Sequence, residues 1–252
     1  MSAVLRAMAP WPMALVLTAL PGGAGGAAAD DATRARGRMV EEIAAMASMT
    51  AADTGRAAFS PRVMAAMASV PRHRFVPAAL AASAYDNRPL SIGEGQTISQ
   101  PYIVALMNDL LEVKPGDSVL EIGTGSGYQA AVLAELAGNV YTVELLAPLA
   151  RQAATTLAAL GYRNINTRTG DGYAGWREYA PYDAIMVTAA APEVPQALID
   201  QLRPGGRLVI PVGARGGVQE LLLIDKLADG RTTRQRVLPV RFVPLVRGAP
   251  GQ

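Results

Sequence analysis

The sequence predicts an α/β protein: a doubly wound, mainly parallel sheet with helices on both faces, preceded by an N-terminal helical extension. Two observations support this prediction. Beyond residue 117, short apolar runs alternate with stretches of helical periodicity, a pattern typical of parallel sheets covered by helices. The first apolar run, residues 118–122, leads into a glycine-rich turn that opens a helix, as the first strand of many doubly wound sheets does. With 50% hydrophobic residues, the chain has enough apolar surface for a sizeable core.

The first 29 residues have the layout of a secretory signal peptide. Arg6 precedes a short apolar run at residues 13–20, and a small, flexible stretch ends in three alanines before Asp30. The run is too short to cross a bilayer as a stable helix. Two prolines weaken the run, so a disordered extension or a mistaken upstream start is the alternative.

The next region, up to residue 112, is predicted to be mostly helical. Residues 30–38, which hold the densest basic group of the chain, are interpreted as a linker. Methionines recur at helical spacing over 39–49 and 61–70, and we expect them to fill the core. Prolines between 71 and 89 predict turns and short helical pieces, and an apolar helix is expected at 103–111.

The rest of the chain alternates between strands and helices. Strands are expected at 118–122, 140–143, 165–168, 182–188 and 207–211, helices at 128–137, 148–160 and 195–202, and a closing strand pair at 221–227 and 234–242. Asp229 and Gly230 between the last two strands favour a tight turn.

The turn after the first strand favours a particular class of ligand. Gly123, Gly125 and Gly127 carry no Cβ, so a ligand can approach the main chain. Glu144 closes the next strand, at the offset where a carboxylate binds ribose hydroxyls in dinucleotide folds. The spacing G-x-G-x-G differs from the dinucleotide fingerprint, and Glu121 would repel a pyrophosphate but suits an ammonium and a sulfonium. S-adenosyl-L-methionine is a ligand of that kind.

We therefore interpret the loop as a site for S-adenosyl-L-methionine and methyl transfer as the leading activity. The alternatives are a nicotinamide or flavin dinucleotide and a purely structural turn. The predicted cofactor-binding residues are Glu121, Gly123, Thr124, Gly125, Ser126, Gly127, Glu144, Asp171 and Gly172. Asp171 follows the third strand, where an acidic group could meet an adenine amino group. Two of these carboxylates have a structural alternative, Asp171 in an Asx turn and Glu144 as a helix cap.

A second polar cluster occupies residues 93–102, just before the predicted helix at 103–111. Ser99 can cap that helix, with Pro101 in its first turn. From position alone, capping is favoured over a direct chemical role.

Composition excludes several other kinds of chemistry. The chain has no cysteine, so disulfides and thiol chemistry are ruled out, and its single histidine, His73, cannot make a conventional zinc site, so we expect no metal. A Ser-His-Asp triad could use only His73, whose arginine neighbours disfavour proton acceptance. The net charge is +2 and the arginines are scattered, so we expect no nucleic-acid partner.

Seven segments together resemble the protein-L-isoaspartate O-methyltransferase family, in order and at compatible spacing over about residues 39–247. They are Val70-Pro-Arg-His-Arg-Phe-Val-Pro77, Gly95-Gln-Thr-Ile-Ser-Gln-Pro101, 119–127, Gly170-Asp-Gly172, Val187-Thr-Ala-Ala190, 205–213 and Val240-Arg-Phe-Val-Pro-Leu-Val246. Many methyltransferases share the glycine turn, whereas the segments around Ser99 and Phe242 are far more specific.

The resemblance implies a Rossmann-like, S-adenosyl-L-methionine-dependent enzyme that methylates the α-carboxyl group of isoaspartyl residues in damaged proteins. The serine that matches Ser99 is the family's active-site residue, which shifts the interpretation of Ser99 from cap to function. The residues implied in substrate binding are Thr97, Ile98, Gln100, Val240, Arg241, Phe242, Val243, Pro244 and Leu245. A methyltransferase acting on another small or carboxylate acceptor, and a non-catalytic cofactor-binding module, are the alternatives.

The expected organisation has four parts: a leader at 1–29, an N-terminal substrate-side region at 30–112, a cofactor-binding core at 113–247 and a tail at 248–252. The expected partners are isoaspartyl proteins and peptides, with no stable membrane association and a monomeric state. The resemblance favours the cytoplasm, whereas the leader favours export to the periplasm or beyond.

Overall fold

The computed structural model describes the backbone of residues 24–248 and the side chains from Asp30 onward. The predicted leader and tail therefore lie mostly outside the described residues. None of the described helices is long and apolar enough to cross a membrane.

A seven-stranded sheet forms the centre of the protein, in the order β5-β4-β3-β6-β7-β8-β9. The strands are β3 (Ser118–Ile122), β4 (Asn139–Glu144), β5 (Ile165–Thr169), β6 (Tyr182–Val187), β7 (Leu202–Val212), β8 (Gln219–Lys226) and β9 (Thr232–Val240). The first five are parallel, and β8 and β9 are antiparallel additions at one edge. The chain moves outward from β3 to β5 and then crosses back to β6, so the two strands at the reversal point are neighbours. Ligands bind at such a point in open α/β sheets.

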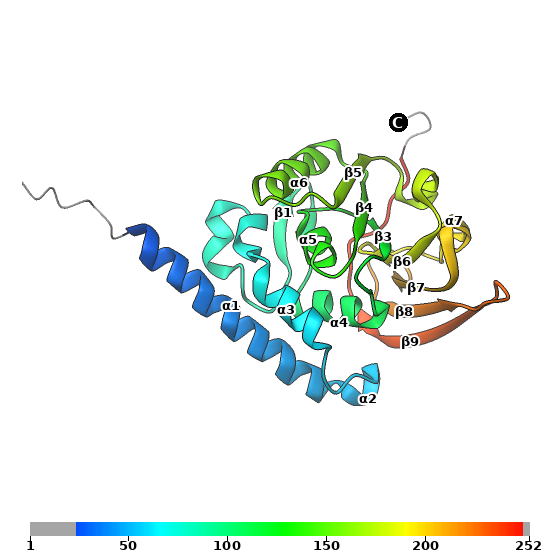
Figure 1. Cartoon of the computed structure of the whole chain (residues 1–252), viewed down its shortest axis with the longest axis horizontal. Helices are drawn as coiled ribbons and strands as arrows, with labels where there is room; N and C mark the ends of the chain where they lie inside the picture. The colour runs from blue at the N-terminus through cyan, green and yellow to red at the C-terminus, as the bar shows by residue number, and fades with distance from the viewer. Residues whose placement is uncertain (1–23, 249–252) are drawn as a thin grey trace, which may run out of the picture.

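Helices cover both faces of the sheet, as the sequence predicts (Figure 1). They are α1 (Ala24–Met49), α2 (Ala51–Thr54), α3 (Pro61–Ser69), α4 (Pro101–Leu111), α5 (Tyr128–Ala134), α6 (Ala147–Ala159) and α7 (Gln196–Gln201), with short 3₁₀ turns at Arg72–Phe75, Ala78–Ser83, Gly172–Ala174 and Arg177–Tyr179. Alternate residues of β3 separate the two cores: Val119 packs with α3, α4 and α5, whereas Leu120 and Ile122 pack with α7 and Trp176. Side chains of one strand alternate between the faces of a sheet, so β3 is buried on both sides.

The N-terminal region corrects one prediction and adds an element that the sequence did not suggest. Residues 30–38 are helical and belong to α1, so their interpretation as a linker is wrong. Ala32 and Ala35 pack against the core at the spacing that continues into Met39, which explains why this polar stretch joins the helix. The unpredicted element is a hairpin of β1 (Leu90–Gly93) and β2 (Gln96–Ile98).

The hairpin turns at Glu94 and Gly95, both of which have positive φ (51° and 68°). Two positive φ angles in a row are typical of a tight hairpin turn with the twist that strands require. Its strands are only four and three residues long, too short for periodicity to reveal them. The hairpin brings Gln96 and Thr97 over the carboxyl edge of the sheet, where they line a cavity.

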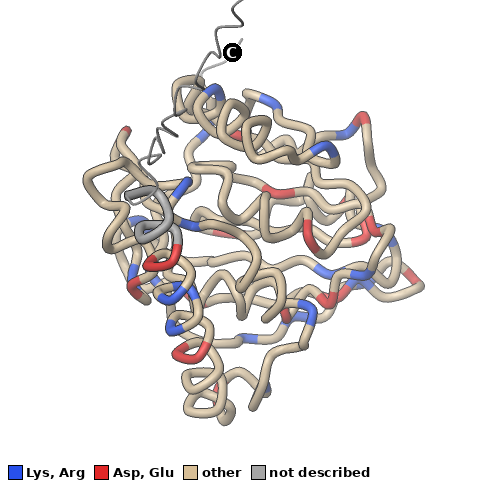
Figure 2. The backbone as a smooth tube through the Cα atoms, turned by 60° about the vertical axis from the view of Figure 1, so that its left-hand side comes forward, with Lys and Arg blue, Asp and Glu red and all other residues tan. Residues whose placement is uncertain are grey.

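Charged residues are spread over the molecule (Figure 2). Lys and Arg positions are interspersed with Asp and Glu positions along the described chain, including α1. In α1, Asp31 pairs with Arg34 one turn later, and Arg36 donates to the carbonyl of Ser69 at 3.2 Å. The basic group of residues 34–38 therefore forms part of a charged helix surface.

Candidate active site

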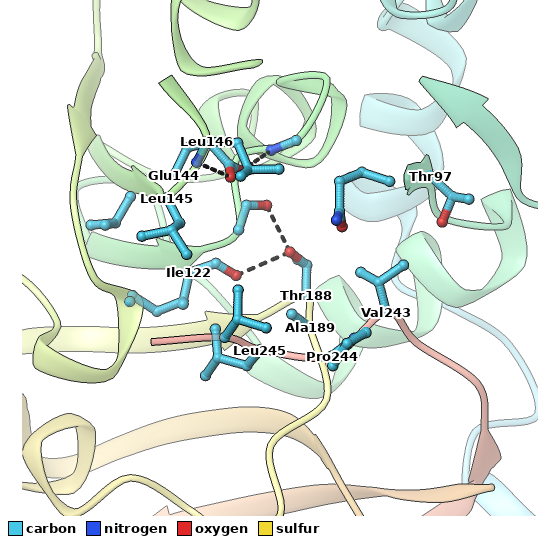
Figure 3. Close-up of a pocket in the computed structure, with 16 residues that line it drawn as sticks. Thr97, Ile122, Glu144, Leu145, Leu146, Thr188, Ala189, Val243, Pro244 and Leu245 are labelled. Carbon is cyan, nitrogen blue, oxygen red and sulfur yellow. Dashed lines mark hydrogen bonds between the residues drawn. The ribbon is translucent and has the colours of Figure 1, made fainter. Parts of the chain in front are cut away.

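The carboxyl ends of β3 and β6 meet beneath a cavity, here called the loop cavity. Its walls include Gly123, Gly125, Glu144, Thr188 and Leu245. Figure 3 shows Glu144 on one side of this cavity and Thr97 on the opposite side, with Thr188 between them. The position is the reversal point of the sheet, where the strand ends of an open α/β fold bind ligands.

The glycines of the loop are required for different reasons. Gly123 has φ 96°, and a Cβ at this position would overlap the hydroxyl of Thr188. Gly125 has φ 53° and lines the loop cavity directly. Gly127 has φ 88°, but its missing Cβ leaves room for Ala153 and Leu157 of α6 at 3.3 Å. Gly123 therefore makes room for Thr188, Gly125 leaves the backbone open to the loop cavity, and Gly127 allows close helix packing.

Glu144 connects the loop to the following helix. One carboxylate oxygen accepts a hydrogen bond from the backbone N–H of Gly125 at 2.8 Å, and the other accepts one from Leu146 at 2.9 Å. Leu146 is the N-cap residue of α6, so Glu144 bonds to the residue before the helix and not to the free N–H groups of its first turn. Each carboxylate oxygen keeps a further lone pair, and Glu144 lines the loop cavity. A ribose hydroxyl can therefore still donate to it.

Thr188 is a site residue that the predicted site did not include. Its hydroxyl donates to the carbonyls of Ile122 at 3.0 Å and Gly123 at 2.7 Å, and its backbone N–H donates to Ile122 at 2.9 Å. These bonds fasten the end of β6 to the end of β3. The one available signal was its place in the family-like segment Val187-Thr-Ala-Ala190, at the end of the predicted strand at 182–188.

A larger cavity lies beside the first, and is here called the β9 cavity. It has a volume of about 540 Å³ and is lined by Ser99, Tyr102, Arg241 and Phe242, among others. Small-molecule sites of roughly 300–1,000 Å³ are typical of proteins. Thr97 and Thr188 line both cavities, so the two open side by side.

Ser99 lies between the two cavities. It lines the β9 cavity and also a narrow space that reaches Thr124 and Ser126 of the glycine loop. The residue that caps α4 is Gln100, with no side-chain capping bond, so the capping interpretation of Ser99 is wrong. The Ser99 hydroxyl forms no hydrogen bond with other described residues, whereas its carbonyl accepts one from Arg72 at 2.7 Å.

The other predicted substrate residues divide between the cavities. Gln100 and residues 240–243 line the β9 cavity, and Ile98 lines the narrow space. Pro244 and Leu245 line the loop cavity instead. The segment is extended because it runs beside the end of β6: Ala190 N–H donates to the Val243 carbonyl at 2.8 Å, and Leu245 N–H donates to the Ala190 carbonyl at 2.7 Å.

Glu121 does not reach either cavity. Its side chain is 0% exposed beneath the loop, where it accepts a 2.6 Å hydrogen bond from Thr142, whose hydroxyl is also bonded to that of Thr124 at 2.6 Å. Strand alternation turns Glu121 to the opposite face from Ile122, which lines the loop cavity. Burial raises the pKa of Glu121 to about 8, with a smaller contribution from the nearby Glu144. The predicted direct contact with a cofactor therefore has no support in its placement.

Asp171 forms the Asx turn that the sequence offered as an alternative. Its carboxylate accepts the backbone N–H of Tyr173 at 2.9 Å and caps the short turn Gly172–Ala174. Gly172 lines the loop cavity, but Asp171 is absent from its walls. His73 bonds to the hydroxyl of Tyr85 at 2.7 Å, and burial lowers its pKa. Neither Asp171 nor His73 lines the loop cavity or the β9 cavity.

The chemistry of the residues around the loop cavity suits S-adenosyl-L-methionine. The cavity is lined by the glycine backbone at Gly123 and Gly125, and its rim carries the carboxylate of Glu144, which has lone pairs to spare. A doubly wound sheet with this loop after its first parallel strand and a carboxylate after the next is typical of proteins that bind a nucleoside-containing cofactor, and the spacing G-x-G-x-G favours an S-adenosyl-L-methionine-dependent methyltransferase over a dinucleotide enzyme.

Comparison with known proteins identifies the family. Residues 47–249 match the family described as protein-L-isoaspartate(D-aspartate) O-methyltransferase (PCMT). The chain is 60% identical over 242 residues to protein-L-isoaspartate O-methyltransferase 1 of Cupriavidus necator, covering 96% of this chain and 93% of that protein. It is 57% identical over 234 residues to protein-L-isoaspartate O-methyltransferase 2 of Syntrophobacter fumaroxidans, covering 93% and 95%. The chain belongs to the protein-L-isoaspartate O-methyltransferase family.

Solved structures agree with this assignment. One protein-L-isoaspartate O-methyltransferase superimposes with a TM-score of 0.69 at 28% identity, over 81% of this chain and 65% of that one. A beta-aspartate methyltransferase (PCMT) from Plasmodium falciparum, in complex with S-adenosyl-L-homocysteine, gives a TM-score of 0.66 at 26% identity, over 75% and 92%. The predicted fold class is thus confirmed.

Glu144→Gln is expected to weaken the binding of S-adenosyl-L-homocysteine by about tenfold or more. The amide nitrogen of the glutamine would face the backbone N–H of Gly125 or Leu146, and two donors cannot form a hydrogen bond with each other. Titration calorimetry measures the change. Glu220→Gln, a matched change on β8 outside the cavity walls, should leave the affinity unaltered. Equal affinities for the wild type and Glu144→Gln would contradict the assigned role.

The raised pKa of Glu121 predicts a pH-dependent stability. Between its ordinary value of 4.5 and about 8, the folded protein holds a proton that the unfolded chain releases. The free energy of unfolding therefore falls as pH rises through this window, by roughly 1–3 kcal/mol between pH 5 and pH 8. Glu121→Gln does not titrate and should lose this component. Urea unfolding of both proteins at the two pH values checks it, and identical pH dependence would count against a protonated Glu121.

Proposed function

We propose that this protein transfers the methyl group of S-adenosyl-L-methionine to the α-carboxyl group of L-isoaspartyl residues in damaged proteins and peptides. The observation that carries the proposal is the β9 cavity beside the loop cavity. The residues that line it include a serine hydroxyl without a described partner, one cation, Arg241, and no carboxylate. Such a lining favours an anionic acceptor held by hydrogen bonding.

The chemistry demands little of the protein. A carboxyl group with a pKa of about 4 is ionised at neutral pH, so no general base is needed to activate it. S-adenosyl-L-methionine supplies the methyl group on a sulfonium that is its own leaving group. The contribution of the chain is alignment, for which proximity and orientation can supply roughly 7–11 kcal/mol.

Particular residues divide this work. Glu144 and the backbone at Gly123 and Gly125 hold the donor in the loop cavity. Ser99 donates its hydroxyl hydrogen to the acceptor carboxylate and turns one carboxylate oxygen toward the donor, without acting as a nucleophile. Phe242 and its neighbours along the extended segment hold the peptide on either side of the isoaspartyl residue. The backbone amide nitrogen of the residue that follows then attacks the methyl ester, methanol leaves, and hydrolysis of the resulting succinimide returns some normal aspartate.

Paired peptides test the substrate. One peptide contains L-isoaspartate and the other contains aspartate at the same position, and both are incubated with methyl-labelled S-adenosyl-L-methionine. Base-labile label on the first and almost none on the second is the expected result. Equal labelling of both would reject isoaspartyl specificity and favour a methyltransferase for another carboxylate. Cofactor binding with no label on either peptide would favour a binding module.

Ser99→Ala is expected to lower kcat on the isoaspartyl peptide by about tenfold or more, because one oriented hydrogen bond to the reacting carboxylate is lost. The Kd for S-adenosyl-L-homocysteine should stay unchanged, since the loop cavity is intact. Ser91→Ala, in the exposed part of the same hairpin region, is the matched control and should keep wild-type turnover. Wild-type turnover in Ser99→Ala would remove Ser99 from the mechanism.

We further propose a monomer that acts on proteins and peptides and needs no nucleic acid or membrane. Two features give opposite indications about its compartment. The family resemblance favours the cytoplasm, and the signal-like first 29 residues favour export. Helix α1 begins at Ala24 and runs through the predicted processing point before Asp30. N-terminal sequencing of the protein isolated from cells decides between them, because a start near Asp30 would indicate processing.

A further inference from the structure

Arg72 is a fully buried arginine that touches both halves of the cleft. Its side chain is 0% exposed. Nε donates to the carbonyl of Ala84 at 2.7 Å, and Nη2 donates to the carbonyl of Ser99 at 2.7 Å. The guanidinium also lies over the ring of Tyr128, with its central carbon 4.8 Å from the ring centroid.

These contacts join three segments that lie far apart along the chain. Ser99 lies between β2 and α4, where neither a strand ladder nor a helix provides a partner for its carbonyl. Tyr128 is the first residue of α5 and directly follows the glycine loop. A planar guanidinium with donors in a fixed fork can hold two carbonyls and rest on a ring at once, which a lysine cannot do.

Stability alone does not explain an arginine at this place. Desolvation lowers the pKa of Arg72 to about 10, so the group is still charged at neutral pH. Among the described residues no carboxylate pairs with it, and Nη1 has no hydrogen-bonding partner. A buried charge without a counter-ion destabilises a protein, and an apolar side chain of similar volume is often as stable or more so.

We propose that Arg72 is a positioning residue for methyl transfer: by holding the Ser99 carbonyl while resting on Tyr128, it sets the Ser99 hydroxyl at the correct distance from the glycine loop. The proposal rests on the function assigned to Ser99 above. Arg72 lies outside the walls of both cavities. It connects Ser99, on the acceptor side of the cleft, to Tyr128, which directly follows the glycine loop on the donor side.

Arg62 provides a control for the number of bonds lost, on a side chain that is exposed rather than buried. It also donates through Nη1 and Nη2 to two backbone carbonyls, those of Val113 at 2.8 Å and Leu136 at 2.6 Å. Val113 precedes β3 and Leu136 follows α5, so Arg62 works at the opposite edge of the sheet from the cleft. Substitution of either arginine removes the same number of side-chain-to-backbone bonds.

The experiment compares Arg72→Lys with Arg62→Lys on the isoaspartyl peptide. We expect kcat to fall by about tenfold or more in Arg72→Lys, because small misplacements of a reacting group are costly. The Kd for S-adenosyl-L-homocysteine should stay within about twofold of the wild type, since twofold is a small free-energy change. Arg62→Lys should keep wild-type kcat. Equal losses of kcat in the two variants would overturn the proposal. Arg72→Met, which removes the buried charge, replaces the lysine variant if the latter does not fold.

A double-mutant cycle asks whether Arg72 acts through Ser99. In the Ser99→Ala background, Arg72→Lys should cause no further loss of kcat, because the group that it positions is gone. The same fold-loss with and without the Ser99 hydroxyl would overturn the proposal, as would an unchanged kcat in Ser99→Ala alone.

A readout independent of activity separates this proposal from the proposed function. Amide hydrogen exchange over residues 96–100 should be faster in Arg72→Met than in the wild type, and unchanged in Arg62→Met. Unchanged exchange in Arg72→Met would overturn the positioning role even in an active enzyme. If the wild-type protein transferred no methyl label to either peptide, the proposed function would be rejected. The exchange result would still decide whether Arg72 holds the segment that carries Ser99.

Discussion

The hydrogen bonds from Thr188 to the carbonyls of Ile122 and Gly123 fix the geometry on which the whole cleft depends. They join the ends of β3 and β6, the two strands at which the chain reverses direction across the sheet. A glycine is required at 123 because a Cβ would occupy the place of the Thr188 hydroxyl. The bare backbone under the donor and the junction of the strands are therefore one structural feature.

The same junction explains why the two cavities open side by side. Thr188 and Thr97 line both the loop cavity and the β9 cavity. The segment that leaves β9 passes beside Ala190, so its first residues line the β9 cavity and Pro244 and Leu245 line the loop cavity. One extended strand of chain thus contributes to both sites, which keeps their separation fixed.

The N-terminal region completes the β9 cavity. Met46 and Thr50, at the end of α1 and just beyond it, line the β9 cavity, and Met46 lies immediately before the residues matched by the family. Thr50 bonds to the hydroxyl of Tyr102 at 2.6 Å, and Asn87 accepts the backbone N–H of Tyr102 at 3.0 Å. The start of α4, and with it the segment that carries Ser99, is held from the α1 side as well as by Arg72.

The sequence by itself determined the order of strands and helices, the glycine loop and the carboxylate of Glu144, because these depend on local periodicity and on spacing along one strand–turn–helix unit. The strand at 118–122 has the predicted bounds, whereas short elements such as the β1–β2 hairpin were missed because so few residues carry no clear period. Only the tertiary structure decided which side chains face the cleft. It turned Glu121 into the interior, used Asp171 as a cap, left the Ser99 hydroxyl unbonded, and brought Thr188 and Arg72 to positions that no local pattern reveals. The physical reason is that a strand residue one position away points to the opposite face, and that contacts across the sheet edge join residues far apart in the chain.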